Sequence, residues 1–135
     1  ASVEEKNPPS YNEEIQEIFG EELEVFNKEF DIKKSTVALS WFQKLKKGGS
    51  HNIHNHGPVG FSAVCYVKYD PEVHTPTIFC SPFFNFMNGD MLHYTPSDIQ
   101  EGDILFFPSV IPHYTYDNHS STERLIVSFN LSLDS

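Results

Sequence analysis

The chain has 135 residues and a mass of 15.5 kDa, enough for one domain whose hydrophobic core needs no disulfide bonds. Nineteen acidic residues against nine lysines and arginines give a formal net charge of −10, and the only basic cluster, Lys44 to Lys47, is short. A protein that binds nucleic acid needs a basic face, so we expect no nucleic-acid partner.

The first thirty residues predict an arm followed by one amphipathic helix. Residues 1–9 are polar and end in two prolines, and Ser10 forms a capping box with Glu13. Apolar residues then recur at steps of three and four as far as Phe30. We therefore expect a loose arm over 1–9 and a helix over 10–31, with Gly20 as its weak point and an apolar stripe that packs on a sheet.

After Asp31 the pattern becomes that of strands. The β-prone segments are separated by Pro, Gly, Asn and Asp turns and cover 36–42, 61–69, 77–80, 103–107, 113–116 and 125–131. No helical segment separates them, which favours a mainly β fold, an antiparallel sandwich or jelly roll with one flanking helix. Residues 80–96 show no clear pattern, and we expect a long loop there that covers a substrate.

Histidines predict a metal site in this β region. His54 and His56 are two residues apart, so an extended chain would point both imidazoles to the same side. Neutral imidazole is a good ligand for iron, zinc and copper, although exposed loop histidines are the alternative for such a pair.

His113 supplies the second half of the predicted site. It follows a short apolar strand and two prolines, Pro108 and Pro112, which would turn it back across a barrel mouth. Alone it could be a packing histidine. The two halves lie 57 residues apart with strands between them, and together they predict that His54, His56 and His113 bind one metal ion.

The order of these motifs resembles that of double-stranded β-helix proteins, the cupins and the 2-oxoglutarate/Fe(II) oxygenases. It is most similar to a small family of 2-oxoglutarate-dependent oxygenases of bacteria and bacteriophages in the prolyl-hydroxylase-like superfamily. The resemblance covers about residues 35–131, and the matching elements are Trp41, His54-Asn55-His56, residues 62–67, Gly102, Phe107-Pro108, His113 and residues 124–130. It implies a double-stranded β-helix over 35–131 in a single domain, with Fe(II) as cofactor and 2-oxoglutarate and oxygen as cosubstrates.

The chain departs from the superfamily pattern at His56. The first ligand pair is usually H-x-D or H-x-E, so that two histidines and one carboxylate bind Fe(II). Asp90, Asp103 and Asp117 do not have the expected position for the carboxylate. Imidazole-rich sites occur in cupins, so a cupin-like metalloprotein with another small-molecule reaction is an alternative. A non-enzymatic module with a structural metal is a third.

Arg124 distinguishes the first two hypotheses. Strand alternation places it on one face with Ile126 and Ser128, opposite a core face. The resemblance implies that this arginine binds the distal carboxylate of 2-oxoglutarate, with hydrogen bonds from Ser128 and Tyr66. The alternative is a solvent-facing Arg124 paired with Glu123 or another surface acid.

The preferred hypothesis is therefore a 2-oxoglutarate-dependent non-haem Fe(II) dioxygenase that hydroxylates a peptide or a small molecule. Cys65 and Cys80 lie in apolar strand-like segments, which predicts buried free thiols and a reducing compartment. No apolar run approaches the roughly 18 residues of a membrane span, and no signal sequence opens the chain. We expect a cytoplasmic protein, of a bacterium or of the host of a phage, with no membrane partner.

Overall fold

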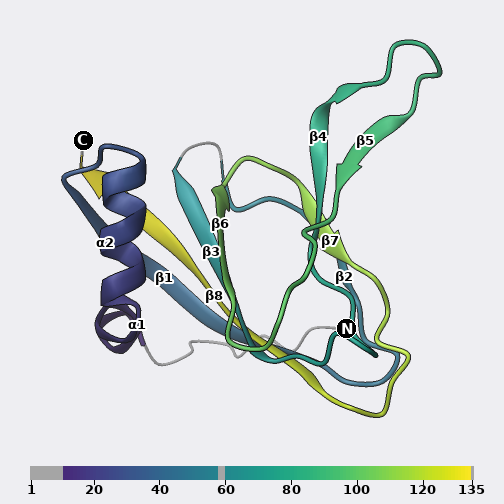
Figure 1. Cartoon of the computed structure of the whole chain (residues 1–135), viewed down its shortest axis with the longest axis horizontal. Coiled ribbons are helices and arrows are strands. Elements are labelled where there is room, and N and C mark those ends of the chain that lie inside the picture. The colour runs from purple at the N-terminus through teal and green to yellow at the C-terminus, as the bar shows by residue number, and fades with distance from the viewer. Residues whose placement is uncertain (1–10, 58–59, 135) are drawn as a thin grey trace.

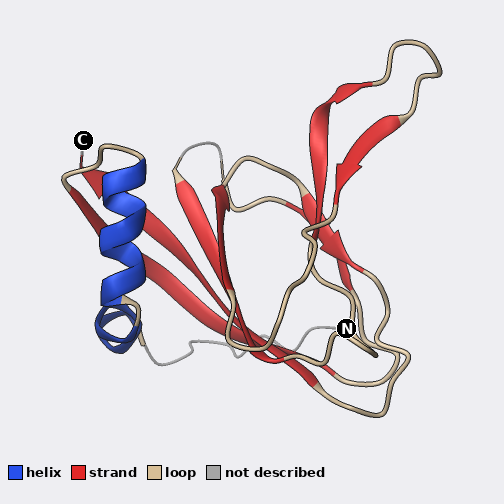
Figure 2. Ribbon diagram, in the orientation of Figure 1, coloured by secondary structure: helices blue, strands red, loops and turns tan. Residues whose placement is uncertain are grey.

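The computed structural model describes residues 11–57 and 60–134, which form two facing β-sheets with helices against the outer face of one (Figure 1, Figure 2). The first sheet has the order β1-β8-β3-β6, and the second has the order β2-β7-β4-β5. The first sheet consists of β1 (Lys34–Leu45), β8 (Arg124–Asp134), β3 (Phe61–Lys68) and β6 (Ile104–Pro108). The second consists of β2 (His51–His54), β7 (His113–Thr115), β4 (Ile78–Phe84) and β5 (Met91–Tyr94).

All of these strand pairs are antiparallel, and the chain passes from one sheet to the other at every connection except the β4–β5 hairpin. This winding is the double-stranded β-helix, so the mainly β fold class expected from the sequence is confirmed. No helix in the described part of the chain is long and apolar enough to cross a membrane.

The expected helix is divided in two. α1 (Asn12–Ile18) and α2 (Gly20–Glu29) meet at Phe19, whose ring stacks on that of Phe129 in β8 with centroids 5.4 Å apart. Glycine is a poor helix former, so Gly20 gives a weak point where the chain can turn to follow the sheet. The capping residue Ser10 and the arm over 1–9 lie outside the described residues.

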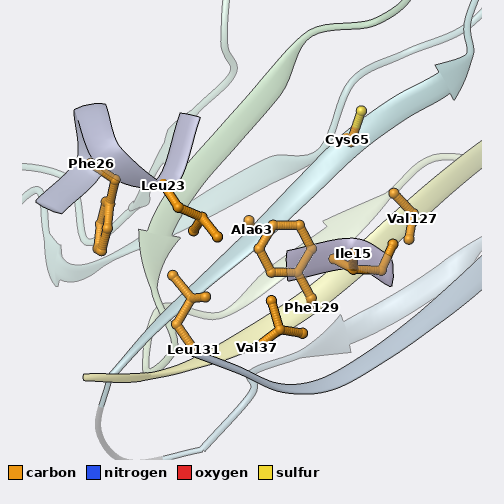
Figure 3. Packing of buried hydrophobic residues seen from close by; sticks show 9 residues of the cluster. All are labelled: Ile15, Leu23, Phe26, Val37, Ala63, Cys65, Val127, Phe129 and Leu131. Atoms are coloured by element: carbon orange, nitrogen blue, oxygen red, sulfur yellow. The ribbon is translucent and has the colours of Figure 1, made fainter. Parts of the chain in front are cut away.

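β8 is buried on both faces along most of its length, and apolar residues occupy much of each face. One face packs under the helices, where Val127, Phe129 and Leu131 meet Ile15, Leu23 and Phe26 (Figure 3). The other face looks into the space between the sheets, where Ile126 packs with Val64, Tyr66 and Phe107. Cys65 and Cys80 are buried and free, as the sequence predicted.

Residues 80–96 contain a β-hairpin, so the expected loop without regular structure is wrong. β4 and β5 pair through Phe79 with Tyr94, Cys80 with His93 and Phe84 with Met91. The strand pattern was hidden because neither face of this hairpin is covered, and most of its side chains are exposed whether apolar or polar. Burial therefore imposes no alternation of residue types on it.

The packing of α2 on the sheet gives a first testable prediction. The Phe26 ring lies 4.9 Å from that of Phe106 and 5.1 Å from that of Phe61. Phe26→Ala should lower the free energy of unfolding by about 3–5 kcal/mol, because it leaves a cavity among these rings. The exposed neighbour Val25 is the matched control, and Val25→Ala should change it by less than about 0.5 kcal/mol. Equal urea midpoints for the two variants would show that α2 is not docked here.

Candidate metal centre

Two of the three predicted histidines lie on neighbouring strands of the second sheet, and the third follows shortly after one of these strands. His54 ends β2 and is paired in register with His113, which begins β7. His56 follows two residues after His54, and its backbone N–H donates to the carbonyl of Ser109. One ring nitrogen from each histidine lies within 4.8 Å of those of the other two. The structure therefore brings all three together.

Hydrogen bonds orient each imidazole. His54 Nδ1 lies 2.7 Å from the Asn52 carbonyl oxygen. His56 Nδ1 lies 3.0 Å from Asn130 Oδ1, and His113 Nδ1 lies 3.1 Å from the Ile111 carbonyl oxygen. Carbonyl and amide oxygens only accept, so every Nδ1 carries the hydrogen and every Nε2 keeps a lone pair. This outer hydrogen bond is the usual device that orients a metal-bound histidine.

The two Nε2 atoms of His54 and His56 lie 3.3 Å apart. With both hydrogens on Nδ1, two lone pairs face each other at this distance, which is unfavourable unless a cation lies beside them. This is the observation that fits a metal ion to the site. Imidazole donors suit iron, zinc, copper and nickel.

Burial favours the neutral form of two of these histidines, His113 and His56. It lowers the pKa of His113 to about 3, and it also lowers the pKa of His56. The neighbouring His51 is half-buried, with its ring centroid 4.0 Å from that of His54, and burial lowers its pKa to about 4. Neutral imidazoles need lose no proton before they bind a metal near neutral pH.

The histidines line a small cavity between the sheets. Its volume, counted as the space open to the centre of a water molecule, is about 20 Å³. Other polar side chains around it include Gln43, Thr77, Thr115 and Ser128. The space suits about one water molecule, so a larger ligand must displace some of the lining side chains.

Arg124 begins β8 and is only 2% exposed. Its Nε donates to the Thr75 carbonyl at 3.2 Å, while its two terminal nitrogens have no partner in the part of the chain that the structure describes. Arg124 forms no ion pair with any described residue. The Glu123 carboxylate oxygen Oε1 lies instead 3.9 Å from Lys44 Nζ. The alternative of a solvent-facing Arg124 paired with Glu123 is therefore wrong.

The guanidinium of Arg124 lies over the Tyr66 ring, 5.3 Å from its centroid. Burial lowers the pKa of Arg124, and the charge of Arg124 contributes to the lowered pKa of His51. Ile126 and Ser128, which share the face of β8 with Arg124, line the cavity beside the histidines. A buried cation without an anion is costly, so an anionic ligand would be bound favourably here.

Ser128 and Tyr66 are both buried, but their hydroxyl groups already have partners. Ser128 donates to the Ala63 carbonyl at 3.0 Å. Tyr66 donates to Thr77 Oγ1 at 2.9 Å and accepts from the Thr77 backbone N–H at 3.0 Å. Either would have to exchange a bond to donate to a carboxylate, and their roles in cosubstrate binding stay predictions.

Asn130 is a site residue to which the sequence analysis assigned no role. Its Oδ1 accepts from His56 Nδ1 and from Ser62 Oγ, so it orients one of the predicted ligands. The sequence did contain a signal for this position, because strand alternation from Arg124 through Ile126 and Ser128 places Asn130 on the same face.

The cluster of possible ligands that the structure brings together contains no carboxylate. Asp103 closes a turn by accepting from the backbone N–H of Gln100, and Asp90 lies in the β4–β5 turn. Within residues 11–57 and 60–134, no Asp or Glu therefore takes the place that the superfamily pattern gives to a carboxylate.

Residues 39–130 match the family described as “Putative 2OG-Fe(II) oxygenase”. The chain belongs to this family. The family takes its name from 2-oxoglutarate and Fe(II), the cosubstrate and cofactor expected from the sequence. The curated proteins contain no match to this chain.

Solved structures similar to this family member share its fold at low sequence identity. An oxidoreductase of the 2OG-Fe(II) oxygenase family from Burkholderia pseudomallei has a TM-score of 0.66 and 14% identity over 94% of this chain. A prolyl-4-hydroxylase from Pseudomonas putida has a TM-score of 0.60 and 12% identity, and the match covers 100% of this chain and 71% of the hydroxylase. A viral collagen prolyl hydroxylase from Paramecium Bursaria Chlorella virus-1 has a TM-score of 0.55 and 14% identity, and the match covers 99% of this chain and 79% of the viral protein. The chain spans only 60% of the length of the Burkholderia protein.

Loss of one imidazole tests the metal site. His113→Ala should abolish stoichiometric Fe(II) binding in anaerobic metal analysis, because two remaining ligands hold the ion poorly. The exposed His119 is the control, and His119→Ala should bind metal like the wild type. His74 is not a suitable control, because both of its ring nitrogens are bonded to the backbone. Full metal binding by His113→Ala would contradict the assignment.

Asn130 gives a prediction that does not remove a ligand. Asn130→Ala should weaken Fe(II) binding by about 10–100-fold, because His56 loses the acceptor that orients its ring. Asn130→Asp keeps an acceptor oxygen and should recover most of the affinity. Equal affinities for Asn130→Ala and the wild type in a competition titration with a chelator would show that Asn130 does not orient a ligand.

Proposed function

We propose that this protein is a 2-oxoglutarate-dependent non-haem Fe(II) dioxygenase that hydroxylates a peptide or small-molecule substrate. The observation that carries the proposal is the buried Arg124, whose terminal nitrogens are unpaired among the described residues. Arg124 lies on the same face of β8 as Ser128, which lines the cavity at the three convergent imidazoles. A metal centre alone does not require a buried cation. A dicarboxylate cosubstrate requires both, because one end binds the metal and the other end needs a positive partner.

His54, His56 and His113 would hold Fe(II) through their Nε2 atoms and leave further coordination positions open. Bound Fe(II) would supply the redox centre at which oxygen is activated while 2-oxoglutarate is decarboxylated and the substrate is hydroxylated. The outer hydrogen bonds keep each Nδ1 protonated and each Nε2 directed at the ion.

Apolar rings shield one side of this centre from water. The Phe107 ring lies 4.9 Å from that of His113, and the Phe79 ring lies 5.8 Å from it. Both rings belong to the buried core between the sheets. A dry wall strengthens the interaction of the site with charged ligands, because the local dielectric constant is low.

Cosubstrate binding requires the cavity to open towards Arg124. Tyr66 lies under the guanidinium, and its hydroxyl is bonded to Thr77, which lines the cavity. Displacement of the Thr77 side chain would join the space beside the histidines to the unpaired nitrogens of Arg124. The hydroxyl of Tyr66 would then be released to donate to the same carboxylate.

The class of substrate is proposed by analogy alone. Two of the structural relatives are named as prolyl hydroxylases, one of them a collagen prolyl hydroxylase. Shared architecture does not transfer a substrate, because specificity depends on side chains around the site. We expect the protein to work in a reducing cytoplasm, since Cys65 and Cys80 are buried and unpaired.

A cupin-like reaction at a three-histidine centre is the second candidate, and the lack of a carboxylate in the cluster favours it. Three neutral ligands leave Fe(II) with more positive charge than two histidines and a carboxylate do. The two candidates differ in their response to 2-oxoglutarate. Metal-loaded protein that shows no rise in melting temperature with saturating 2-oxoglutarate would support the cupin-like reaction.

Arg124→Met tests the proposed cosubstrate site. Metal binding should be retained, while the affinity for 2-oxoglutarate, measured by calorimetry with Fe(II) under anaerobic conditions, should fall by at least about 30-fold. The free energy of unfolding without ligands should change little, because removal of a buried unpaired charge offsets the lost hydrogen bond from Nε to the Thr75 carbonyl. If Arg124 had only a structural role, Arg124→Met would instead lower the free energy of unfolding.

Lys44 is the matched control for this experiment, because it is an exposed cation on the neighbouring strand β1. Lys44→Met should leave both the affinity and the melting temperature close to those of the wild type. Unchanged 2-oxoglutarate affinity in metal-loaded Arg124→Met would reject the proposed role of Arg124.

A further inference from the structure

The β4–β5 hairpin projects from the body of the molecule (Figure 1, Figure 2). β4 is paired with β7 only at Ile78 and Phe79, and the backbone N–H of Cys80 donates to the Pro112 carbonyl. Beyond this point β4 pairs only with β5 among the described residues. The hairpin is therefore an arm attached at one end.

The arm exposes large apolar side chains. They are Phe83, Phe84, Phe86, Met87, Met91, Leu92 and Tyr94, with Phe86 91% and Met87 80% exposed at the tip. Between Ser81 and Tyr94 the chain has one carboxylate, Asp90, and no lysine or arginine, although the whole chain carries a net charge of −10. The acidic groups that would repel a second acidic molecule are thus almost absent from this arm.

The exposed area is large for a monomer. A fully exposed large side chain offers on the order of 200 Å², so the exposed fractions of these seven residues amount to roughly 900 Å². The largest apolar patch of a typical monomer is about 300–600 Å². A stable protein interface covers about 800 Å² on each partner, which is what this arm provides.

The outer edge of β5 is free. β5 is the last strand of its sheet in the described part of the chain, and all four of its residues, Met91 to Tyr94, are exposed. Lysine or proline commonly protects such an edge from pairing with another chain, and β5 has neither. The edge is therefore able to extend its sheet with a further strand.

An apolar groove of about 450 Å³ lies at the base of the arm. Phe79, Tyr94, Pro96, Leu105 and Ile111 are among the residues that line it. One chain thus carries both an exposed apolar tip and an open apolar groove of a size for such side chains.

We propose that the β4–β5 hairpin joins two copies of this chain in a two-fold symmetric dimer. β5 pairs antiparallel with β5 of the second copy, so that Met91 lies opposite Tyr94 of the partner subunit. Antiparallel pairing places the tip of each arm beside the base of the other, where the groove lies. Phe86 and Met87 then fill the groove of the second copy.

The composition of the arm favours a second copy over a transient partner. Interfaces of transient complexes are about as apolar as the rest of a protein surface, whereas homodimer interfaces are more apolar. The arm is almost free of charge, and its complement, the groove, is present in the same chain. The proposal is independent of the chemistry at the histidines.

The test is sedimentation equilibrium of the full chain at concentrations up to about 100 μM. The wild type should sediment as a dimer, and the double variant Phe86→Asp, Met87→Asp should weaken association by at least about 30-fold, because it buries charge in an apolar contact. Leu92→Lys should do the same by placing like charges near the two-fold axis. Val25→Asp, at an exposed apolar residue of α2, is the control and should remain dimeric.

The arm variants should fold, because the substituted side chains are exposed within one chain. Unchanged Fe(II) binding would demonstrate this and separate the test from the proposed function. A wild-type protein that is monomeric throughout the concentration range overturns the dimer and leaves the arm to another kind of partner. A dimer that is equally stable in the arm variants and in Val25→Asp overturns it as well.

Discussion

The burial of β8 on both faces is the constraint on which the rest of the structure depends. β8 pairs with β1 on one side and with β3 on the other, so every second residue points into the space between the sheets. That inner face carries Arg124, Ile126, Ser128 and Asn130 in turn. The outer face is used entirely for packing under the helices. A single strand therefore anchors the core and supplies polar groups at both ends of the candidate site.

The polar groups of the inner face differ in how well they are satisfied. Asn130 is bonded to His56 and Ser62, and it rigidifies the metal end of the site. Arg124 keeps two nitrogens without a partner in a buried position. Such an arrangement costs stability in the free protein, and an anion bound to Arg124 would restore that stability. The difference between the two ends of the strand therefore supports the proposal of a charged cosubstrate at Arg124.

The first strand of the β4–β5 arm also borders the metal centre, because Phe79 of β4 is paired in register with His113 of β7. The same strand thus contributes a wall of the metal centre near its start and an exposed apolar surface near its end. Contact between two copies through the arm would fix the position of β4 and with it the Phe79 ring beside His113. The proposed contact and a wall of the site would therefore share this one strand, although β4 contributes none of the three histidines.

The sequence by itself determined the fold class, the approximate strands and the three histidines, because these depend on local alternation, turn residues and short spacings. Alternation along β8 also placed Arg124 on the inner face. Only the tertiary structure decided that Arg124 is buried without an anion, since the sequence equally allowed a pair with Glu123. It also decided that Tyr66 and Ser128 already have partners and that 80–96 is a hairpin. Hydrogen bonds between distant strands and the exposure of a hairpin depend on what packs against them, which no local pattern records.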